Sequence, residues 1–378
     1  MANVQVYLGG SVFDGYKVHD GLGARFVDGR FDTFCPPEDL TGGPHVTDLK
    51  GDLLSPGFVD LQVNGGDGLM LNDDPSIATL ARMAQAHRRL GTVQFLPTLI
   101  TDTVEKTQAT IAAVRAALDA GIPGIAGLHL EGPHLSVARK GAHDAALIRP
   151  MAESDLETLL AAKSGLPVLK VTLAPESVTR EHVATLADAG VVISLGHTDA
   201  DYETCMAYVQ AGAGCATHLF NAMSQFGNRQ PGLVGAVLDS GDLSCGLIAD
   251  GLHVHPAVMR AAWRGKQGPG RLFLVSDAMA VAGTDQSEFM LEGRRILRRD
   301  KKLTLEDGTL AGADLDMASA VRTLVAQVGL TRAAALQAAT TTPAKLIGLP
   351  TGLTPGTTPL SDMIRISPDL SVAAPITG

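Results

Sequence analysis

The sequence predicts an α/β fold: a (β/α)8 barrel of the TIM type with a small β-sandwich domain built from both chain ends. From Pro56 onward, short apolar runs rich in β-branched residues alternate with stretches in which apolar residues recur at helical spacing. Strands that alternate with helices are typical of a parallel sheet. Both chain ends lack this alternation and contain turn dipeptides and short strand patterns. We therefore expect the ends to form a separate unit.

Eight apolar runs are the expected strands of the barrel. Helical patterns, such as residues 75–91, lie between them. Several predicted helices are followed by a glycine, which readily adopts the left-handed conformation that ends a helix before the next strand. These glycines are Gly91, Gly121, Gly190 and Gly212. The eight runs cover residues 53–61, 92–98, 125–131, 168–174, 191–197, 214–218, 244–250 and 272–278.

Two domains are expected from this organisation. Residues 1–54 contain short alternating runs and hairpin dipeptides such as Asp14-Gly15, and residues 349–378 return to turns and short strands. These two segments are expected to pair into one β-sandwich beside a barrel of residues 55–348. Between residues 286 and 310, a charged alternating pattern predicts a surface hairpin after the eighth strand, with its basic run facing solvent.

Composition excludes several classes of protein. The chain has 378 residues, of which 45% are hydrophobic, so it can bury a large core. Its net charge of -10 and its pI near 5.5, without any Lys/Arg-rich run, argue against nucleic acid or an anionic membrane as a partner. We expect no export signal and no membrane-spanning segment. The four cysteines have no CxxC spacing, which favours buried thiols in the reducing cytoplasm.

Polar residues follow the predicted strands at positions where a barrel places its chemistry. Glu131, His197 and His218 each stand where a strand pattern gives way to a loop, and Gln62 and Asn64 follow the first run. A catalytic divalent ion needs several nitrogen or oxygen ligands and one open position. Glu131, His197 and His218 supply such a set. Taken singly, each residue has the alternative role of a hydrogen-bonded structural group.

Two further residues are candidates for catalysis. Asp277 follows the eighth run, where its carboxylate could take a proton from an activated water and later deliver one to a leaving group. Its alternative role is a helix cap or a structural ion pair. His143 is a loop histidine that could polarise a carbonyl, and its alternative role is a solvated loop residue.

Nine segments of the chain, between about Pro56 and Gly348, together resemble the amidohydrolase superfamily. Within it they resemble the N-acetylglucosamine-6-phosphate deacetylases. The joint occurrence of the segments is far more specific than any one of them. In chain order they read PGFVDLQVNG, GLHLEGPHL, RKGAH, LAPE, SLGHTDA, ATHLFNAM, NRQPGLVGAVLD, IADGLHVHP and LVSDAM.

The resemblance implies specific roles at the metal site. Glu131, His197 and His218 would bind one essential divalent metal ion, commonly Zn²⁺ or another transition ion. Asp277 would be the general acid and base. His143 would take part of the carbonyl-polarising role.

The resemblance also implies that only one metal ion is bound. Many members of the superfamily have His-x-His after the first strand to hold a second ion, whereas this chain has Gln62 and Asn64 in the corresponding pair. Amide side chains are poor ligands for borderline-soft cations. Gln62 and Asn64 are instead expected to contribute to substrate binding.

A substrate clamp is the third implication of the resemblance. Arg229 and His253 would bind a sugar phosphate, with Asn221 and Ala222 contacting the substrate through side chain or backbone. A guanidinium group matches phosphate geometry well. In related enzymes a second subunit completes the phosphate site, so a homodimer is expected. The alternative for Arg229 is an ion pair with a surface carboxylate.

Deacetylation of N-acetylglucosamine 6-phosphate, which gives glucosamine 6-phosphate and acetate, is therefore the expected function. Two alternatives remain open. The metal motifs define the reaction better than the sugar, so the substrate could be N-acetylgalactosamine 6-phosphate or another N-acyl amino sugar. From a different class, the chain could be a non-catalytic protein that binds a sugar phosphate.

Overall fold

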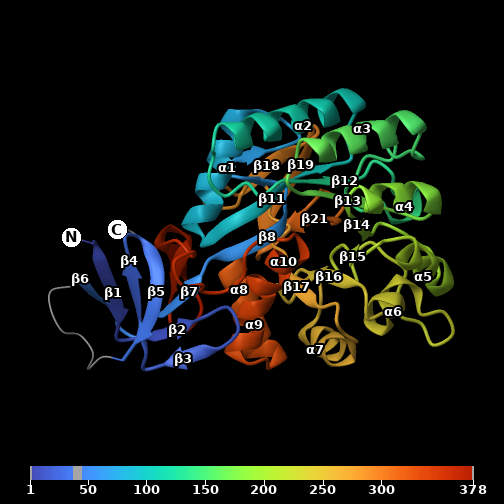
Figure 1. Cartoon of the computed structure of the whole chain (residues 1–378). Coiled ribbons are helices and arrows are strands. Elements are labelled where there is room, and N and C mark those ends of the chain that lie inside the picture. The colour runs from blue at the N-terminus through green and yellow to red at the C-terminus, as the bar shows by residue number, and fades with distance from the viewer. Residues whose placement is uncertain (1, 37–44, 377–378) are drawn as a thin grey trace.

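An eight-stranded parallel barrel forms the centre of the computed structural model, which describes residues 2–36 and 45–376 (Figure 1). Each of the eight apolar runs overlaps one barrel strand, and each strand pairs in parallel with the next along the chain. The predicted barrel is therefore confirmed. Its strands are β8 (Phe58–Val63), β11 (Thr92–Ile100), β12 (Leu128–Glu131), β13 (Leu169–Leu173), β14 (Val192–Leu195), β15 (Cys215–Ala216), β16 (Ser244–Leu247) and β17 (Leu272–Leu274).

The barrel closes where the segment after β17 meets β8. The Asp277 backbone N–H donates to the Gln62 carbonyl at 3.1 Å, and the Asn64 N–H donates to the Ala278 carbonyl at 2.9 Å. Val63 and Ala278 form a parallel bridge at the same seam. Residues more than 200 positions apart thereby become neighbours at the carboxyl ends of the strands.

Helices surround the barrel and end where the glycine pattern predicts (Figure 1). Gly91, Gly121, Gly190 and Gly212 have φ values of 86°, 66°, 82° and 115°, which lie in the region that favours glycine. The helices before the insertion described below are α1 (Ile77–Arg89), α2 (Val104–Asp119), α3 (Glu153–Ser164), α4 (Arg180–Asp188), α5 (Tyr202–Gln210), α6 (Gly232–Asp239) and α7 (Pro256–Gly265). Those after it are α8 (Met317–Thr323), α9 (Arg332–Ala339) and α10 (Thr341–Leu346).

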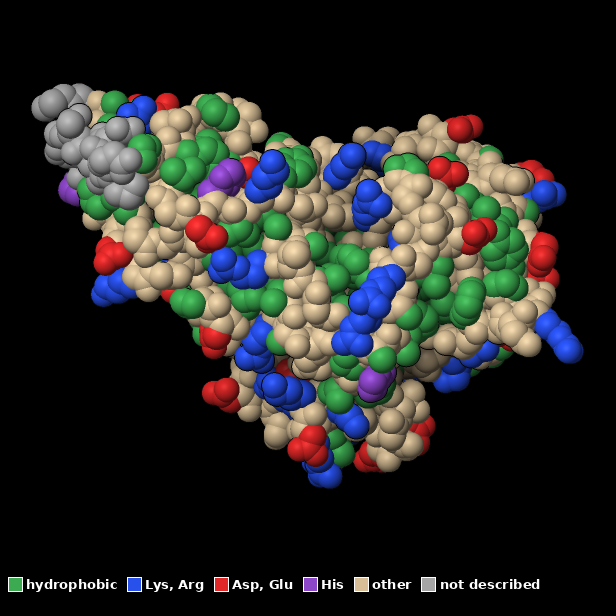
Figure 2. All heavy atoms as spheres, turned by 90° about the horizontal axis from the view of Figure 1, so that it is seen from below, with side chains coloured by type: hydrophobic (Ala, Val, Ile, Leu, Met, Phe, Trp, Pro, Cys, Tyr) green, Lys and Arg blue, Asp and Glu red, His purple; other side chains and the backbone are tan. Residues whose placement is uncertain are grey.

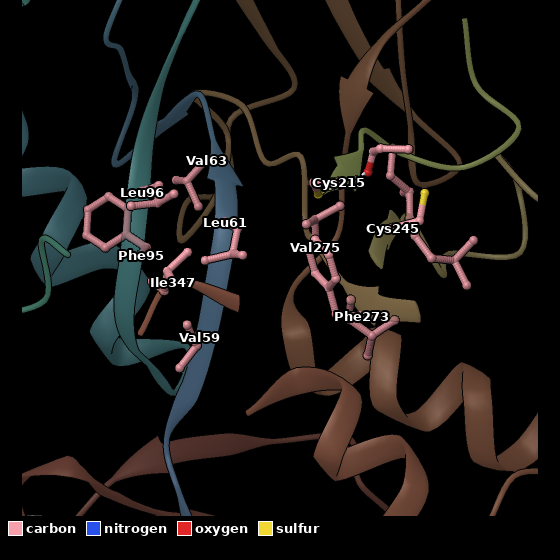
Figure 3. Packing of buried hydrophobic residues seen from close by; sticks show 14 of the residues in the cluster. Val59, Leu61, Val63, Phe95, Leu96, Cys215, Cys245, Phe273, Val275 and Ile347 are labelled. Atoms are coloured by element: carbon pink, nitrogen blue, oxygen red, sulfur yellow. Dashed lines mark hydrogen bonds between the residues drawn. The ribbon is translucent and has the colours of Figure 1, made fainter. Parts of the chain in front are cut away.

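Alternation along β8 separates the barrel core from the functional site. Val59, Leu61 and Val63 lie on the side of the strand that faces Ile347, as Figure 3 shows. They belong to the large apolar cluster between the strands and the helices. Successive side chains of a strand point to opposite faces. The polar residues at the even positions, among them Gln62, therefore point into the barrel.

Both chain ends contribute to a second, sheet-rich domain, as expected. Strand β22 pairs antiparallel with β7, so the C-terminal segment joins the N-terminal one. One sheet has the order β5-β4-β1-β6, with β1 (Val4–Leu8), β4 (Gly23–Val27), β5 (Arg30–Cys35) and β6 (His45–Asp48). The other has the order β23-β22-β7-β2-β3, with β2 (Ser11–Phe13), β3 (Val18–Asp20), β7 (Leu53–Pro56), β22 (Met363–Ile366) and β23 (Ala373–Pro375).

The residue limits of the two domains, 1–54 plus 349–378 and 55–348, stay a prediction. Residues 1, 37–44 and 377–378 of the predicted small domain lie outside the described residues.

Residues 286–310 form more than the expected surface hairpin. They belong to a four-stranded antiparallel sheet of β18 (Glu288–Leu291), β19 (Arg294–Arg299), β20 (Lys302–Thr304) and β21 (Leu310–Ala313), called the insert sheet below. One face of it is buried, because Phe289 and Leu291 pack with Ile100 and Met279 at the carboxyl end of the barrel. The predicted surface hairpin is therefore part of a larger sheet with one buried face, since apolar residues alternate with the charged ones and need a surface to cover. In the basic run, Arg295 and Arg299 are exposed, as expected.

The structure also bears on the expectations from composition. No helix within residues 2–36 and 45–376 is long and apolar enough to cross a membrane. Cys205, Cys215 and Cys245 are buried free thiols. On the face seen from below, Lys and Arg side chains lie across the middle, and most of the Asp and Glu side chains lie toward the edges (Figure 2).

Strand β22 connects the small domain to the barrel, so truncation of its buried side chain at Ile364 should destabilise the fold. Ile364 is fully buried in the barrel cluster, whereas the preceding residue, Met363, packs in the small-domain cluster. We expect Ile364→Ala to lower the free energy of unfolding by about 2–5 kcal/mol, because it leaves a cavity. Urea denaturation followed by circular dichroism measures this change. Val372→Ala, at a residue that is 59% exposed, is the control and should change stability by less than about 0.5 kcal/mol.

Candidate active site

The functional candidates gather at the carboxyl rim of the barrel. Glu131 is the last residue of β12, and His197, His218 and Asp277 follow β14, β15 and β17 within two or three residues. In a parallel barrel all these strand ends share one rim. His197, His218 and Asp277 have φ values of 48°, 30° and 51°, which are uncommon for residues other than glycine. Such backbone conformations cluster at functional sites.

Three side chains converge on one point, as the sequence predicts. The Glu131 Oε1 atom lies 3.0 Å from His197 Nε2 and 3.1 Å from His218 Nε2. The two histidine nitrogens are 3.2 Å apart. All three side chains are buried. Burial opposes ionisation of Glu131, but the hydrogen bonds from His197 and His218 outweigh it and hold the pKa of this carboxyl well below its usual range.

The chemistry of this donor set fits a divalent cation. His197 donates its Nδ1 proton to the Arg139 carbonyl at 2.9 Å, so Nε2, which faces Glu131 and His218, is the ring nitrogen placed to bind a cation. Metal-binding histidines commonly donate their other ring N–H to a carbonyl in this way. A cation would satisfy the two nitrogens and the carboxylate oxygen together. The group of Glu131, His197 and His218 could therefore hold a metal ion.

His143 lies beside this group but differs from it in its proton position. Its ligand atom lies within 4.8 Å of those of Glu131 and His197, and its ring centroid is 4.5 Å from that of His197. The Thr101 backbone N–H donates to His143 Nδ1 at 3.3 Å, and the Thr101 hydroxyl is 2.8 Å from the same atom. Burial lowers the pKa of His143 to about 3, so its ring is neutral near pH 7.

A neutral His143 that accepts at Nδ1 carries its proton on Nε2. It is therefore arranged to donate a hydrogen bond rather than to ligate a metal through Nε2. The alternative of a solvated loop histidine is wrong, because His143 is only 4% exposed.

Asp277 is held by two amide groups. Its Oδ1 atom accepts from Asn64 Nδ2 at 2.7 Å and from Gln62 Nε2 at 3.2 Å. Burial and the nearby charge of Glu131 raise the pKa of Asp277. A carboxyl with a raised pKa is better suited to take up and release a proton near neutral pH. The alternatives of a helix cap or an ion pair do not apply, since no described helix begins at Asp277 and no described cation pairs with it.

Gln62 and Asn64 contact carboxylates at this site, which the sequence did not indicate. Gln62 Nε2 also donates to Glu131 Oε2 at 3.1 Å, so this amide connects the two acidic residues. The amide oxygens of both residues are buried and have no partner in the described chain. Asn64 lines the pocket and Gln62 does not, although both residues are 1% exposed. Substrate binding by these residues stays a prediction.

A pocket of about 260 Å³ opens over the candidate metal group. Of the predicted substrate contacts, Asn221, Ala222 and His253 line it together with Asn64. His253 is oriented by Asp250, whose Oδ2 lies 2.6 Å from His253 Nδ1. Burial opposes ionisation of Asp250, but its hydrogen bond with His253 outweighs that effect and lowers its pKa.

Arg229 is the one predicted site residue that lies on the exposed surface outside this pocket. It belongs to the loop before α6, and within the described residues it forms no hydrogen bond or ion pair. The alternative of pairing with a surface carboxylate is therefore not observed. A single chain does not bring Arg229 to the pocket lining.

Other residues that line the pocket were not predicted from the sequence. Leu291, Thr309 and Leu310 of the insert sheet and its last loop line one side of the pocket. The sequence feature that could have identified these residues is the alternation of apolar and charged residues within this segment. The insert sheet reaches the rim because the Ala313 N–H donates to the Asp277 carbonyl at 2.9 Å. No local pattern marks that long-range contact.

Comparison with known proteins reveals clear relatives. Residues 53–359 match the model of the Amidohydrolase family. The chain is 48% identical over 307 residues to an N-acetylgalactosamine-6-phosphate deacetylase from Shewanella sp. (strain ANA-3), covering 81% of this chain and 77% of that protein. It is 35% identical to the N-acetylglucosamine-6-phosphate deacetylase of Haemophilus influenzae, covering 86% and 85%. The crystal structure of N-acetylglucosamine-6-phosphate deacetylase from Pasteurella multocida is similar, with a TM-score of 0.91, 32% identity, and 98% and 97% coverage.

Proposed function

Because the chain belongs to the amidohydrolase family, we propose that it is a metal-dependent enzyme that removes the acetyl group of an N-acetylated amino sugar 6-phosphate. The products are the free amino sugar 6-phosphate and acetate. The observation that carries the proposal is the meeting of Glu131, His197 and His218 within 3.2 Å, with Asp277 at the same pocket. The names of the relatives supply the substrate class.

Two sugars are candidates for the substrate. N-acetylglucosamine 6-phosphate is the first, on the similarity to the Haemophilus influenzae and Pasteurella multocida enzymes. N-acetylgalactosamine 6-phosphate is the second, because the Shewanella relative named for that substrate is 48% identical, against 35% for the Haemophilus influenzae relative. The two sugars differ only in the orientation of the C4 hydroxyl, so both fit the same reaction.

In the proposed enzyme, Glu131, His197 and His218 hold one divalent ion. Zn²⁺ is the proposed ion, because it is commonly bound by histidine nitrogen and carboxylate oxygen. When bound, such an ion polarises the acetamide carbonyl and makes a water molecule more acidic.

The side chains of the pocket then have distinct tasks. His143 donates its Nε2 proton in a hydrogen bond to the acetyl oxygen as negative charge develops there. Asp277 takes a proton from the attacking water through Oδ2, the oxygen that no described donor occupies. Asp277 then transfers this proton to the nitrogen of the leaving amine as the C–N bond breaks. Asn64 and Gln62 hold the carboxylate in place for both transfers.

The proposed enzyme is a homodimer in which Arg229 of one subunit completes the phosphate site of the other. Arg229 is exposed and unpaired within the described chain, while His253 already lines the pocket. Two large apolar side chains on the same loops are exposed, Phe226 by 64% and Leu252 by 41%. Exposed apolar groups that lie close to functional residues are typical of a contact surface.

We also propose that the protein works in the cytoplasm. Cys205, Cys215 and Cys245 are free thiols. Free thiols without disulfides are usual in a reducing compartment. Burial raises the pKa of Cys205 to about 12, so its reactive thiolate form is scarce at neutral pH.

One experiment tests the proposed function. Purified protein is analysed for bound metal and assayed for acetate release from N-acetylglucosamine and N-acetylgalactosamine, each with and without a 6-phosphate. We expect about one divalent ion per chain, activity that chelation abolishes, and a clear preference for the 6-phosphates. Comparison of kcat/KM between the two 6-phosphates identifies the sugar. Binding of a sugar phosphate without any acetate release would instead support the non-catalytic alternative.

Asp277→Asn separates proton transfer from metal binding. The amide keeps the shape of the side chain but cannot accept the proton of water, so kcat should fall roughly 10²- to 10⁴-fold while the metal content stays that of the wild type. Glu131→Gln is the contrasting variant, because it should lower the metal content as well as the rate. Steady-state kinetics and elemental analysis measure both. Near-normal turnover by Asp277→Asn would contradict the assigned role.

Arg229→Gln tests the shared phosphate site. We expect light scattering to give twice the chain mass of 39.2 kDa for both the wild type and the variant. The variant should raise KM for the 6-phosphate substrate roughly tenfold or more, since it removes a charged hydrogen bond to phosphate. KM for the unphosphorylated sugar should change little. A monomeric wild-type protein would rule out this arrangement.

A further inference from the structure

A hydrogen bond joins the insert sheet to the loop that carries His143. Arg294, the first residue of β19, donates from Nη2 to the Ala142 carbonyl at 2.7 Å. The same nitrogen lies 3.0 Å from Glu292 Oε2, in the turn before β19. The Glu292 and Arg294 side chains are 16% and 33% exposed, so this ion pair is partly shielded from water. A shielded pair holds its geometry better than a fully exposed one.

The Ala142 carbonyl and the His143 N–H belong to the same planar peptide unit. The His143 N–H donates to the Lys140 carbonyl at 3.1 Å. Arg294 therefore holds one side of this peptide unit while Lys140 holds the other. Because the side chain is anchored separately by Thr101 at Nδ1, these contacts together set where His143 Nε2 points.

The loop around His143 needs such an external contact. Gly141 and Asp144, on either side of the Ala142–His143 pair, are exposed. Gly141 has a φ of 56° and no side chain to restrict it. Ala142 packs against the apolar cluster of the insert sheet, which places its carbonyl within reach of Arg294.

We propose that Arg294, supported by Glu292, is a positioning residue of the reaction that fixes the Ala142–His143 peptide and thereby the donor atom of His143. This inference rests on the proposed function, in which His143 donates to the acetyl oxygen. The insert sheet then has two roles: it lines one side of the pocket, and through Arg294 it positions the donor atom of His143.

Arg294→Met removes the donor while keeping an apolar stem of similar length. We expect kcat to fall roughly tenfold, since small displacements of catalytic groups reduce rates strongly. KM and metal content should stay close to the wild type. Arg294→Lys keeps a charged donor and should recover part of the rate. Arg295→Met is the matched control, because Arg295 is on the same strand and pairs with Glu288 at the surface.

A double-mutant cycle distinguishes positioning of His143 from a general structural effect. If Arg294 acts through His143, the variant that combines Arg294→Met with His143→Ala should have the kcat of His143→Ala alone. If the double variant loses a further tenfold, or if Arg294→Met alone has the wild-type kcat, the proposal is overturned.

Hydrogen exchange gives a readout that does not depend on activity. Amide exchange in residues 140–147 should be faster in Arg294→Met than in the wild type and unchanged in Arg295→Met. Absence of acetate release by the wild type would refute the proposed function, while the exchange rates would still decide whether Arg294 orders the loop. Unchanged exchange in Arg294→Met would overturn the positioning role.

Discussion

The contact of the Glu131 carboxylate with two histidine nitrogens is the interaction on which the site depends. A buried carboxylate is costly unless it is paired. Glu131 Oε1 meets His197 and His218, and its Oε2 accepts from Gln62. Both carboxylate oxygens are therefore satisfied inside the barrel. The strand ends β12, β14 and β15 bring these groups together from three separate parts of the chain.

Closure of the barrel adds the second half of the site. The seam between β8 and the segment after β17 brings Gln62 and Asn64 to Asp277. Asp60 strengthens the seam, since its carboxylate accepts from the Ser276 N–H at 3.2 Å. Burial raises the pKa of Asp60 to about 7, so the seam contains a carboxyl group that takes up a proton at a much higher pH than an exposed aspartate does. The barrel thus supplies the position of Asp277 and the environment that raises its pKa.

The insert sheet shows how a peripheral element becomes part of a site. Its apolar face covers Ile100 and Met279 at the rim, and its residues Leu291 and Leu310 line the pocket. The same packing brings Arg294 to the loop of His143. The rim residues and the insert sheet therefore depend on one another: the rim buries the apolar face of the sheet, and the sheet restricts a loop of the rim.

Local patterns in the sequence were sufficient to predict the eight strands, the glycines that end four helices, and the strand-end positions of Glu131, His197, His218 and Asp277. Strand alternation, helical periodicity and left-handed glycines are short-range properties, so they can be identified without a structure. Only the tertiary structure decided that His143 is buried and that its Nδ1 accepts from the Thr101 N–H. It alone revealed that the Gln62 and Asn64 amides bind carboxylates and that residues 286–310 cover the rim. These features arise from contacts between segments distant in the chain, which form only when the barrel closes and the insert sheet buries its apolar face.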